Sequence, residues 1–211
     1  MVSRSIADVL EPPLASDEEL TRSLGLRLRE ARQDAGLSLR ELSRRIEVSP
    51  GLLSQIENGL TRPSVGTLYA LVGELRISID RVFDTKHAPD DRQSPGGVAV
   101  QRAGDRPVLE LDGGVRWERL GDDGDTEMVF ALVTYDPVGD GDGGAERPHI
   151  RHPGREHGYV ESGRLEVEIG DRVVELGVGD AISFGSDEPH RFRALGGEPA
   201  RAVWFNLPPM R

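Results

Sequence analysis

The chain has 211 residues, no cysteine, 36% hydrophobic residues and a formal net charge of −11 at pH 7. The lack of cysteine excludes disulfides, thiolate catalysis and zinc fingers. No apolar run is long enough to cross a bilayer, and the N-terminus has no secretory pattern. We therefore expect a cytoplasmic protein with no membrane partner.

The length allows two modest hydrophobic cores, and the distribution of charge supports such a division. Residues 22–85 carry ten arginines against eight acidic residues, whereas the flanking segments are acidic. An acidic chain repels nucleic acid as a whole, so any DNA binding must depend on a local basic face and on base contacts. Residues 1–20, which contain Pro12-Pro13 and an acidic run from residue 17 to 19, are predicted to be a flexible leader.

Residues 37–63 have the pattern of two short helices joined by a turn. Ser38 precedes an apolar-periodic run and Glu41 follows three residues later, which predicts a capping box and a helix that ends near Glu47. Ser49-Pro50 is a second helix start, and Asn58-Gly59 suits a left-handed helix end. The outer face of the second helix carries small or polar residues, so it can approach base edges closely.

At these residues the chain resembles the Cro/CI-like (XRE-type) helix-turn-helix family, over residues 21–84. The resemblance rests on LRxxR in the first helix, GLSLREL, VSPGLLSQIENG, RPSVGTLYAL and ISIDRVF. It implies a five-helix DNA-binding domain in which the helix of residues 50–58 enters the major groove. Leu39 departs from the family, because many relatives place there a glutamine that holds the DNA backbone.

The same resemblance implies a DNA-binding set in two groups. The residues that begin the recognition helix or face bases are Ser49, Pro50, Gly51, Ser54 and Gln55. The residues that contact phosphates are Arg40, Asn58, Thr61, Arg62, Ser64 and Thr67.

Residues 85–97 combine proline, glycine and charge without periodicity, which predicts a linker. Beyond it, residues 98–208 show short alternating segments punctuated by Gly, Asp and Pro, as in a β-sandwich or barrel. The expected strands are 117–120, 128–135, 159–169, 173–176, 181–184, 190–195 and 202–207. The glycine-rich stretch of residues 139–146 lacks the lysine of a phosphate-binding loop, so we interpret it as a hairpin connection.

The segments RPHIRHPGREHGYVESG and GDAISFGSDEPHRF resemble the two motifs of the cupin family, over residues 98–208. The resemblance implies an all-β, double-stranded β-helix (jelly-roll) barrel, and a multidomain α + β chain overall. It also implies His152, Glu156 and His190 as ligands of a divalent metal such as iron, manganese, zinc or nickel. The first histidine of the family's HxH pair corresponds to Ile150. His149 does not replace it, because adjacent side chains of an extended strand face opposite ways.

The alternative interpretation is that these histidines are hydrogen-bonded pocket or core residues and that the carboxylate pairs with an arginine. A small-molecule pocket needs no metal. The predicted effector pocket consists of His152, Glu156, Tyr159, His190, Phe192 and Trp204.

Two function classes follow. The preferred one is a sequence-specific transcriptional regulator, not an enzyme, that acts as a homodimer on a pseudo-palindromic double-stranded operator and whose cupin domain binds a small-molecule effector. The alternative is a metal-dependent cupin enzyme, of dioxygenase or isomerase type, with an autoregulatory DNA-binding head. A third reading assigns the barrel to dimerisation alone. The incomplete histidine set favours the regulator over open metal chemistry.

Overall fold

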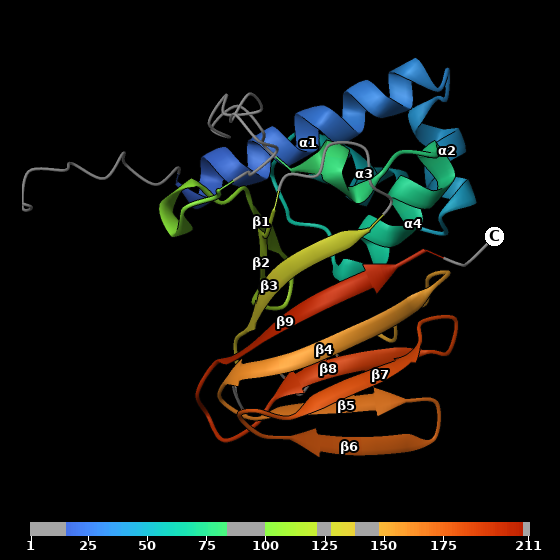
Figure 1. Ribbon diagram of the computed structural model, residues 1–211. Helices are drawn as coiled ribbons and strands as arrows, with labels where there is room; N and C mark the ends of the chain where they lie inside the picture. The colour runs from blue at the N-terminus through green and yellow to red at the C-terminus, as the bar shows by residue number, and fades with distance from the viewer. Residues whose placement is uncertain (1–15, 84–99, 122–127, 138–147, 209–211) are drawn as a thin grey trace, which may run out of the picture.

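The structure is a computed structural model that describes residues 16–83, 100–121, 128–137 and 148–208, and a helical domain lies against two β-sheets (Figure 1). The helical domain contains α1 (Asp17–Asp34), α2 (Leu39–Arg45), α3 (Pro50–Glu57), α4 (Val65–Leu75) and the 3-10 helix η2 (Ile79–Val82). A second 3-10 helix, η3 (Ala103–Asp105), precedes the sheets. None of the described helices is long and apolar enough to cross a membrane.

All four α-helices begin in the same way, with a serine whose hydroxyl accepts a hydrogen bond from the backbone of the third helical residue. The capping serines are Ser16, Ser38, Ser49 and Ser64. Only α1 has the reciprocal capping box, because the carboxylate of Glu41 in α2 accepts a hydrogen bond from Arg45 instead.

The structure corrects two expectations about the helical domain. The domain has four α-helices in the described ranges rather than five, because the closing ISIDRVF segment forms the single tight turn η2. Residues 17–20 belong to the first turn of α1 and not to a leader, since Ser16 caps that helix. The rest of the predicted leader, the linker 85–97 and the stretch 139–146 lie outside the described residues.

A buried ion pair fixes α3 against α1. Arg32 donates to both carboxylate oxygens of Glu57, at 2.6 and 2.8 Å, and also to the carbonyl oxygen of Leu37. The Arg32 and Glu57 side chains are only 11% and 3% exposed. The helices approach closely at Gly25, where an added methyl carbon would lie 2.4 Å from the carbonyl oxygen of Ile56. The orientation of α3 relative to α1 therefore depends on the Arg32–Glu57 ion pair and on the close approach at Gly25.

The β-domain consists of two antiparallel sheets that enclose a common interior (Figure 1). The larger sheet has the order β1-β2-β3-β9-β4-β7 and the smaller one the order β6-β5-β8. The strands are β1 (Val108–Leu111), β2 (Val115–Arg119), β3 (Val129–Tyr135), β4 (Arg155–Ser162), β5 (Leu165–Ile169), β6 (Arg172–Leu176), β7 (Ala181–Gly185), β8 (His190–Ala194) and β9 (Ala200–Leu207).

The strand predictions are met in outline, but β4 begins at Arg155, four residues before the expected start, and two further differences follow. The segment 159–169 is divided between β4 and β5, because Gly163 turns the chain with a φ of 74°. The sequence reasoning also missed β1. Alternation in β5 follows the prediction, with Leu165, Val167 and Ile169 buried and the glutamates between them facing outward.

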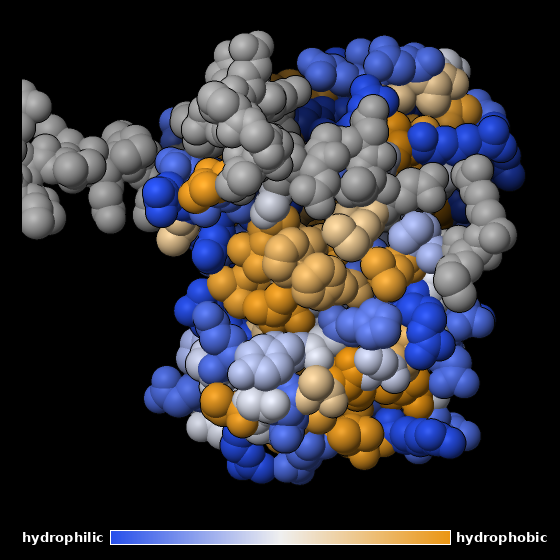
Figure 2. Space-filling view, viewed as in Figure 1, coloured by the Kyte–Doolittle hydropathy of each residue, from blue (hydrophilic) through white to orange (hydrophobic). Residues whose placement is uncertain are grey.

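The two domains share one continuous cluster of buried apolar side chains. A buried ion pair crosses their boundary, with Arg119 of β2 at 2.9 Å from Asp80 of η2. The backbone N–H of Asp112 also donates to the carbonyl oxygen of Pro63, at 3.0 Å. On the outer face of the sheet, apolar residues gather over β3 and β9, where Phe130 and Phe205 stack (Figure 2).

Replacing Arg32 with alanine is expected to lower the free energy of unfolding by about 3–5 kcal/mol, because Glu57 would then be a buried carboxylate without its partner. Urea denaturation of the full chain measures this. The control is Arg45→Ala, which removes ion pairs whose side chains are 38% and 31–40% exposed and should cost about 1 kcal/mol or less. Equal losses for both variants would contradict the structural role of the buried pair.

Candidate functional site

The outer face of α3 is displayed, as a recognition helix requires. Pro50, Gly51, Gln55 and Asn58 are exposed, whereas Leu53 and Ile56 on the opposite face are buried in the helical core. Ser49 caps the helix. This arrangement leaves the side chain of Gln55 available to base edges.

The residues proposed to contact phosphates differ in their exposure and in the hydrogen bonds that they already make within the protein. Arg40 is exposed on α2. Arg62 is held by Asp17 at 2.9 Å and by the hydroxyl of Thr21. Ser64 and Thr67 hydrogen-bond to each other in the first turn of α4 and line the cleft that faces the barrel. Ser54 accepts a hydrogen bond from the amide of Asn58, and Thr61 is half-buried.

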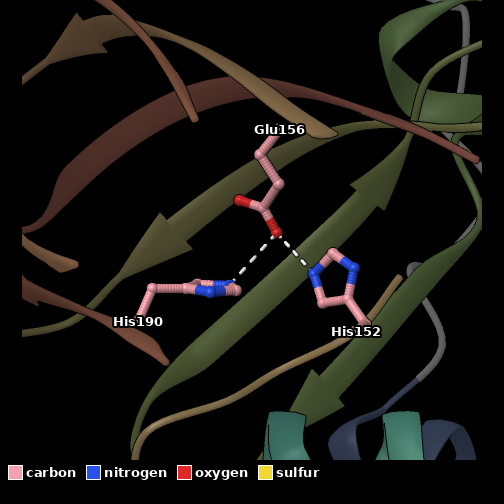
Figure 3. Close-up of side chains that lie close together, drawn as sticks. All are labelled: His152, Glu156 and His190. Carbon is pink, nitrogen blue, oxygen red and sulfur yellow. Dashed lines mark hydrogen bonds and ion pairs between the residues drawn. The ribbon is translucent and has the colours of Figure 1, made fainter. Parts of the chain in front are cut away.

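A second site lies inside the barrel, where two histidines and a carboxylate converge (Figure 3). Glu156 points inward from β4, His190 begins β8, and His152 lies in the segment that precedes β4. His152 Nε2 is 2.6 Å and His190 Nε2 is 3.3 Å from the same oxygen, Glu156 Oε1. The three side chains are buried. The sequence-predicted ligand set is thus brought together.

Backbone pairing positions these side chains. Ile150 and His190 exchange two backbone hydrogen bonds, at 2.8 and 3.0 Å, and the N–H of His152 donates to the carbonyl oxygen of Ser186. The segment of residues 150–152 is thereby tied to β8 and to the turn before it. As a result, the His152 ring is directed toward Glu156.

The hydrogen bonds of His190 determine which ring nitrogen carries the proton. Nδ1 lies 2.8 Å from the carbonyl oxygen of Glu188, which can only accept, so Nδ1–H donates. In the neutral ring the lone pair is then on Nε2, which faces the Glu156 carboxylate and has no hydrogen-bond partner among the described residues. A lone pair facing a carboxylate oxygen is unfavourable, so a cation, either a proton or a metal ion, fits between them.

The electrostatics favour an ionised carboxylate at this centre. Burial by itself raises the pKa of Glu156, but the hydrogen bond with His152 and the interactions with the nearby His152 and His190 rings outweigh burial and hold that pKa below its ordinary value.

The donor set fits a divalent metal. Two imidazole nitrogens and one carboxylate oxygen lie within 4.8 Å of one another, and the hydrogen bond from His190 Nδ1 to a carbonyl is the usual outer support of a metal-binding histidine. Such a set suits iron, manganese, zinc or nickel and leaves coordination positions open.

The neighbouring residues of the motif do not join this group. His149 Nε2 interacts with Glu168 on β5, at 2.8 Å, and its side chain is 39% exposed. Ile150 is buried and lies beside Gly66 of α4. The first histidine position of the cupin pattern is therefore occupied by an interdomain packing residue.

Five of the six predicted effector-pocket residues meet inside the barrel. Phe192 and Trp204 line a small cavity together with Glu156, and His190 stacks edge-on against Phe192. Tyr159 was wrongly assigned to this pocket. It is 50% exposed, because it lies three residues from Glu156 on β4 and so points to the opposite face of the sheet.

Two residues of the site were missed by the sequence reasoning. Tyr69 of α4 stacks on the His152 ring, with centroids 4.1 Å apart and an interplanar angle of 11°. Asn206 of β9 donates to the Tyr69 hydroxyl at 2.7 Å. One signal was present in the sequence, since Tyr69 lies off the apolar stripe formed by Leu68, Leu71 and the other buried residues of its helix.

Two family models match the chain. Residues 28–82 match a helix-turn-helix model and residues 136–206 match a cupin domain model. The chain therefore combines a helix-turn-helix domain with a cupin domain, and the helix-turn-helix match precedes the cupin match.

Several known proteins match nearly the whole length of the chain. The chain is 28% identical over 195 residues to the HTH-type transcriptional regulator PuuR of Escherichia coli (strain K12). This alignment covers 92% of this chain and 98% of PuuR. The chain is 25% identical over 191 residues to the regulator SutR of the same organism, covering 86% and 92% respectively. A solved HTH_3 family transcriptional regulator from Vibrio cholerae has a similar fold, with a TM-score of 0.64, 20% identity and coverage of 92% of this chain and 100% of that one.

Replacing His190 with alanine is expected to weaken binding of Zn²⁺ or Co²⁺ by more than about tenfold, because one of three convergent donors is lost. Metal content after dialysis and the visible absorption of Co²⁺ measure this effect. His149→Ala is the matched control and should bind metal as the wild type does, since His149 faces Glu168. Equal metal content in the wild type and the His190 variant would rule out this metal centre.

Proposed function

We propose that the protein is a sequence-specific transcriptional regulator in which α3 binds the major groove and the cupin barrel binds a small-molecule effector. The observation that carries the proposal is the exposed polar face of α3, which the Arg32–Glu57 pair holds in a fixed orientation. The relatives named as transcriptional regulators, which match nearly the whole chain, support the same function.

The mode of DNA binding follows from charge and symmetry. The chain carries a net charge of −11, so sequence-independent attraction to DNA is weak and base contacts supply the preference. A homodimer would place two copies of α3 about 34 Å apart, which matches half-sites one helical turn apart on a pseudo-palindromic operator. We propose this assembly for the protein.

The buried site supplies the regulatory input in this proposal. His152, Glu156 and His190 would hold a divalent metal, which would act as a Lewis acid for oxygen atoms of an effector. The protein side chains determine access and orientation. An effector changes operator affinity only to the extent that it prefers one of two domain arrangements.

The enzyme alternative has the convergent donor set in its favour. Access to the whole set is restricted, however, because the cleft of about 1080 Å³ beside α4 is lined by His152 but not by Glu156 or His190, and the cavity beside Glu156 has a volume of only about 30 Å³. An enzyme that turns over organic substrates needs a pocket of a few hundred Å³. The described site is therefore better suited to sensing, and we propose that the protein is not an enzyme.

Replacing Gln55 with alanine is expected to lower the preference for the operator over random DNA by about 1–3 kcal/mol, because a base contact is lost. Arg40→Ala is expected to weaken both complexes alike and to reduce the salt dependence by about one unit, because a phosphate contact is lost. Fluorescence anisotropy on an operator selected from genomic fragments measures both effects.

The control for these variants is Arg172→Ala, which removes an exposed arginine of β6 on the barrel and should bind DNA as the wild type does. Identical losses of Gln55→Ala on operator and random DNA would contradict its assignment to base recognition. Failure of the wild type to prefer any fragment would contradict the proposed function itself.

A further inference from the structure

Tyr69 is a residue of α4 in the helical domain, but its side chain lies against the His152, Glu156 and His190 group of the barrel. Its ring covers one face of His152, and its hydroxyl accepts the hydrogen bond from Asn206. Asn206 in turn stands directly opposite Glu156 in the pairing of β9 with β4. Burial and the charge of Glu156 raise the pKa of Tyr69 well above its ordinary value, so the side chain is a neutral phenol.

Two spaces meet at this tyrosine. A cleft of about 1080 Å³ lies between α4 and the mouth of the barrel, and a cavity of about 30 Å³ lies inside the barrel beside Glu156. Tyr69, Val129, Ile150 and Asn206 line both spaces and so form the wall between them. The inner cavity has room for about one water molecule, so a larger ligand reaches Glu156 only if this wall moves.

Three of the four wall residues are fixed in the barrel. Val129 and Asn206 are register partners in β3 and β9, and Ile150 is bridged to His190. Tyr69 comes from the other domain and is held by its stack on His152, an edge-on ring contact with Trp117 and one hydrogen bond from Asn206. It is therefore the wall residue that can withdraw without breaking a strand pairing.

The polar groups around the two spaces favour a ligand with an anionic oxygen. Arg76 and Arg151 line the cleft with exposed side chains, although Arg151 Nε already donates to the carbonyl oxygen of Asp187. The acidic residues of the cleft are Asp80, which is engaged by an ion pair with Arg119, and the exposed Glu47. Trp204 lines the inner cavity, and its buried Nε1–H donor has no hydrogen-bond partner among the described residues. A carboxylate suits both, because its two oxygens accept from a guanidinium fork or from an indole N–H.

We propose that the effector site is shared by the two domains and binds a small carboxylate, which enters through the cleft and displaces Tyr69 from His152. The proposal rests on the regulator function above. Tyr69 follows the fully buried Leu68 on α4, and α4 is joined to α3 by the turn of residues 58–64. Displacement of Tyr69 therefore acts on the helix next to the recognition helix.

The ligand class is tested on the full chain with acetate and succinate, each matched with its neutral amide, and with inorganic phosphate. Tryptophan emission is a suitable signal, because Trp204 lines the inner cavity and the Trp117 ring lies 6.0 Å from that of Tyr69. A saturable change is expected with at least one carboxylate and not with the amides or phosphate. An equal response to the amides, or no response to either carboxylate, would overturn the assignment.

The role of Tyr69 is tested by comparing two variants in operator binding with and without the carboxylate. The wild type should change operator affinity by about fivefold or more, and Tyr69→Phe, which keeps the ring stack, should retain most of this response. Tyr69→Ala should still bind the carboxylate and the operator, but its operator affinity should no longer depend on the carboxylate. Tyr159→Ala, on the outer face of the same barrel, should respond like the wild type.

Thermal unfolding of each variant separates loss of coupling from loss of folding, and Tyr69→Leu replaces the alanine variant if the latter does not fold. A wild-type response in Tyr69→Ala, or in Tyr69→Leu where it replaces the alanine variant, would overturn the inference while leaving the regulator function intact. Absence of any preferred operator for the wild type would instead contradict the proposed function.

Discussion

A buried carboxylate is the constraint around which the β-domain is organised. Glu156 is 3% exposed, and an ionised carboxylate in that environment costs several kcal/mol unless it is paired and hydrogen-bonded. The chain satisfies it with His152 and His190, which come from segments far apart in sequence. Both histidines reach it only when β4, β8 and the segment of residues 150–152 are correctly paired. Closure of the barrel and assembly of the site are thus one requirement.

The same requirement extends to the helical domain. Tyr69 stacks on one face of the His152 ring, so the environment of the site is complete only when α4 lies against the barrel. The buried pair of Asp80 and Arg119 fixes this contact from a second point. On the other side of the helical core, α3 is held to α1. The exposed face of α3 and the buried site are therefore joined through one packed core rather than through a linker alone.

Local chemistry made much of this structure predictable. Serine caps mark helix starts, and the cupin spacing identifies His152, Glu156 and His190, because these signals lie within short segments. Tyr159 was misplaced although strand parity excludes it, since an odd separation from Glu156 turns it outward. Tyr69 and Asn206 could not be found in this way. Their meeting depends on how two domains pack, and no spacing within either motif encodes that contact.

Ile150 shows why the incomplete ligand set is consistent with regulation. A histidine at this position would add a fourth donor, but the isoleucine instead packs where a methyl group on Gly66 of α4 would come within 3.3 Å of its Cγ2. The residue at this position therefore contacts the helical domain and supplies no metal ligand. A metal held by His152, Glu156 and His190 would have further coordination positions available to an effector. An effector that reached Glu156 past Tyr69 would contact α4, and its binding free energy would then be coupled to the placement of that helix.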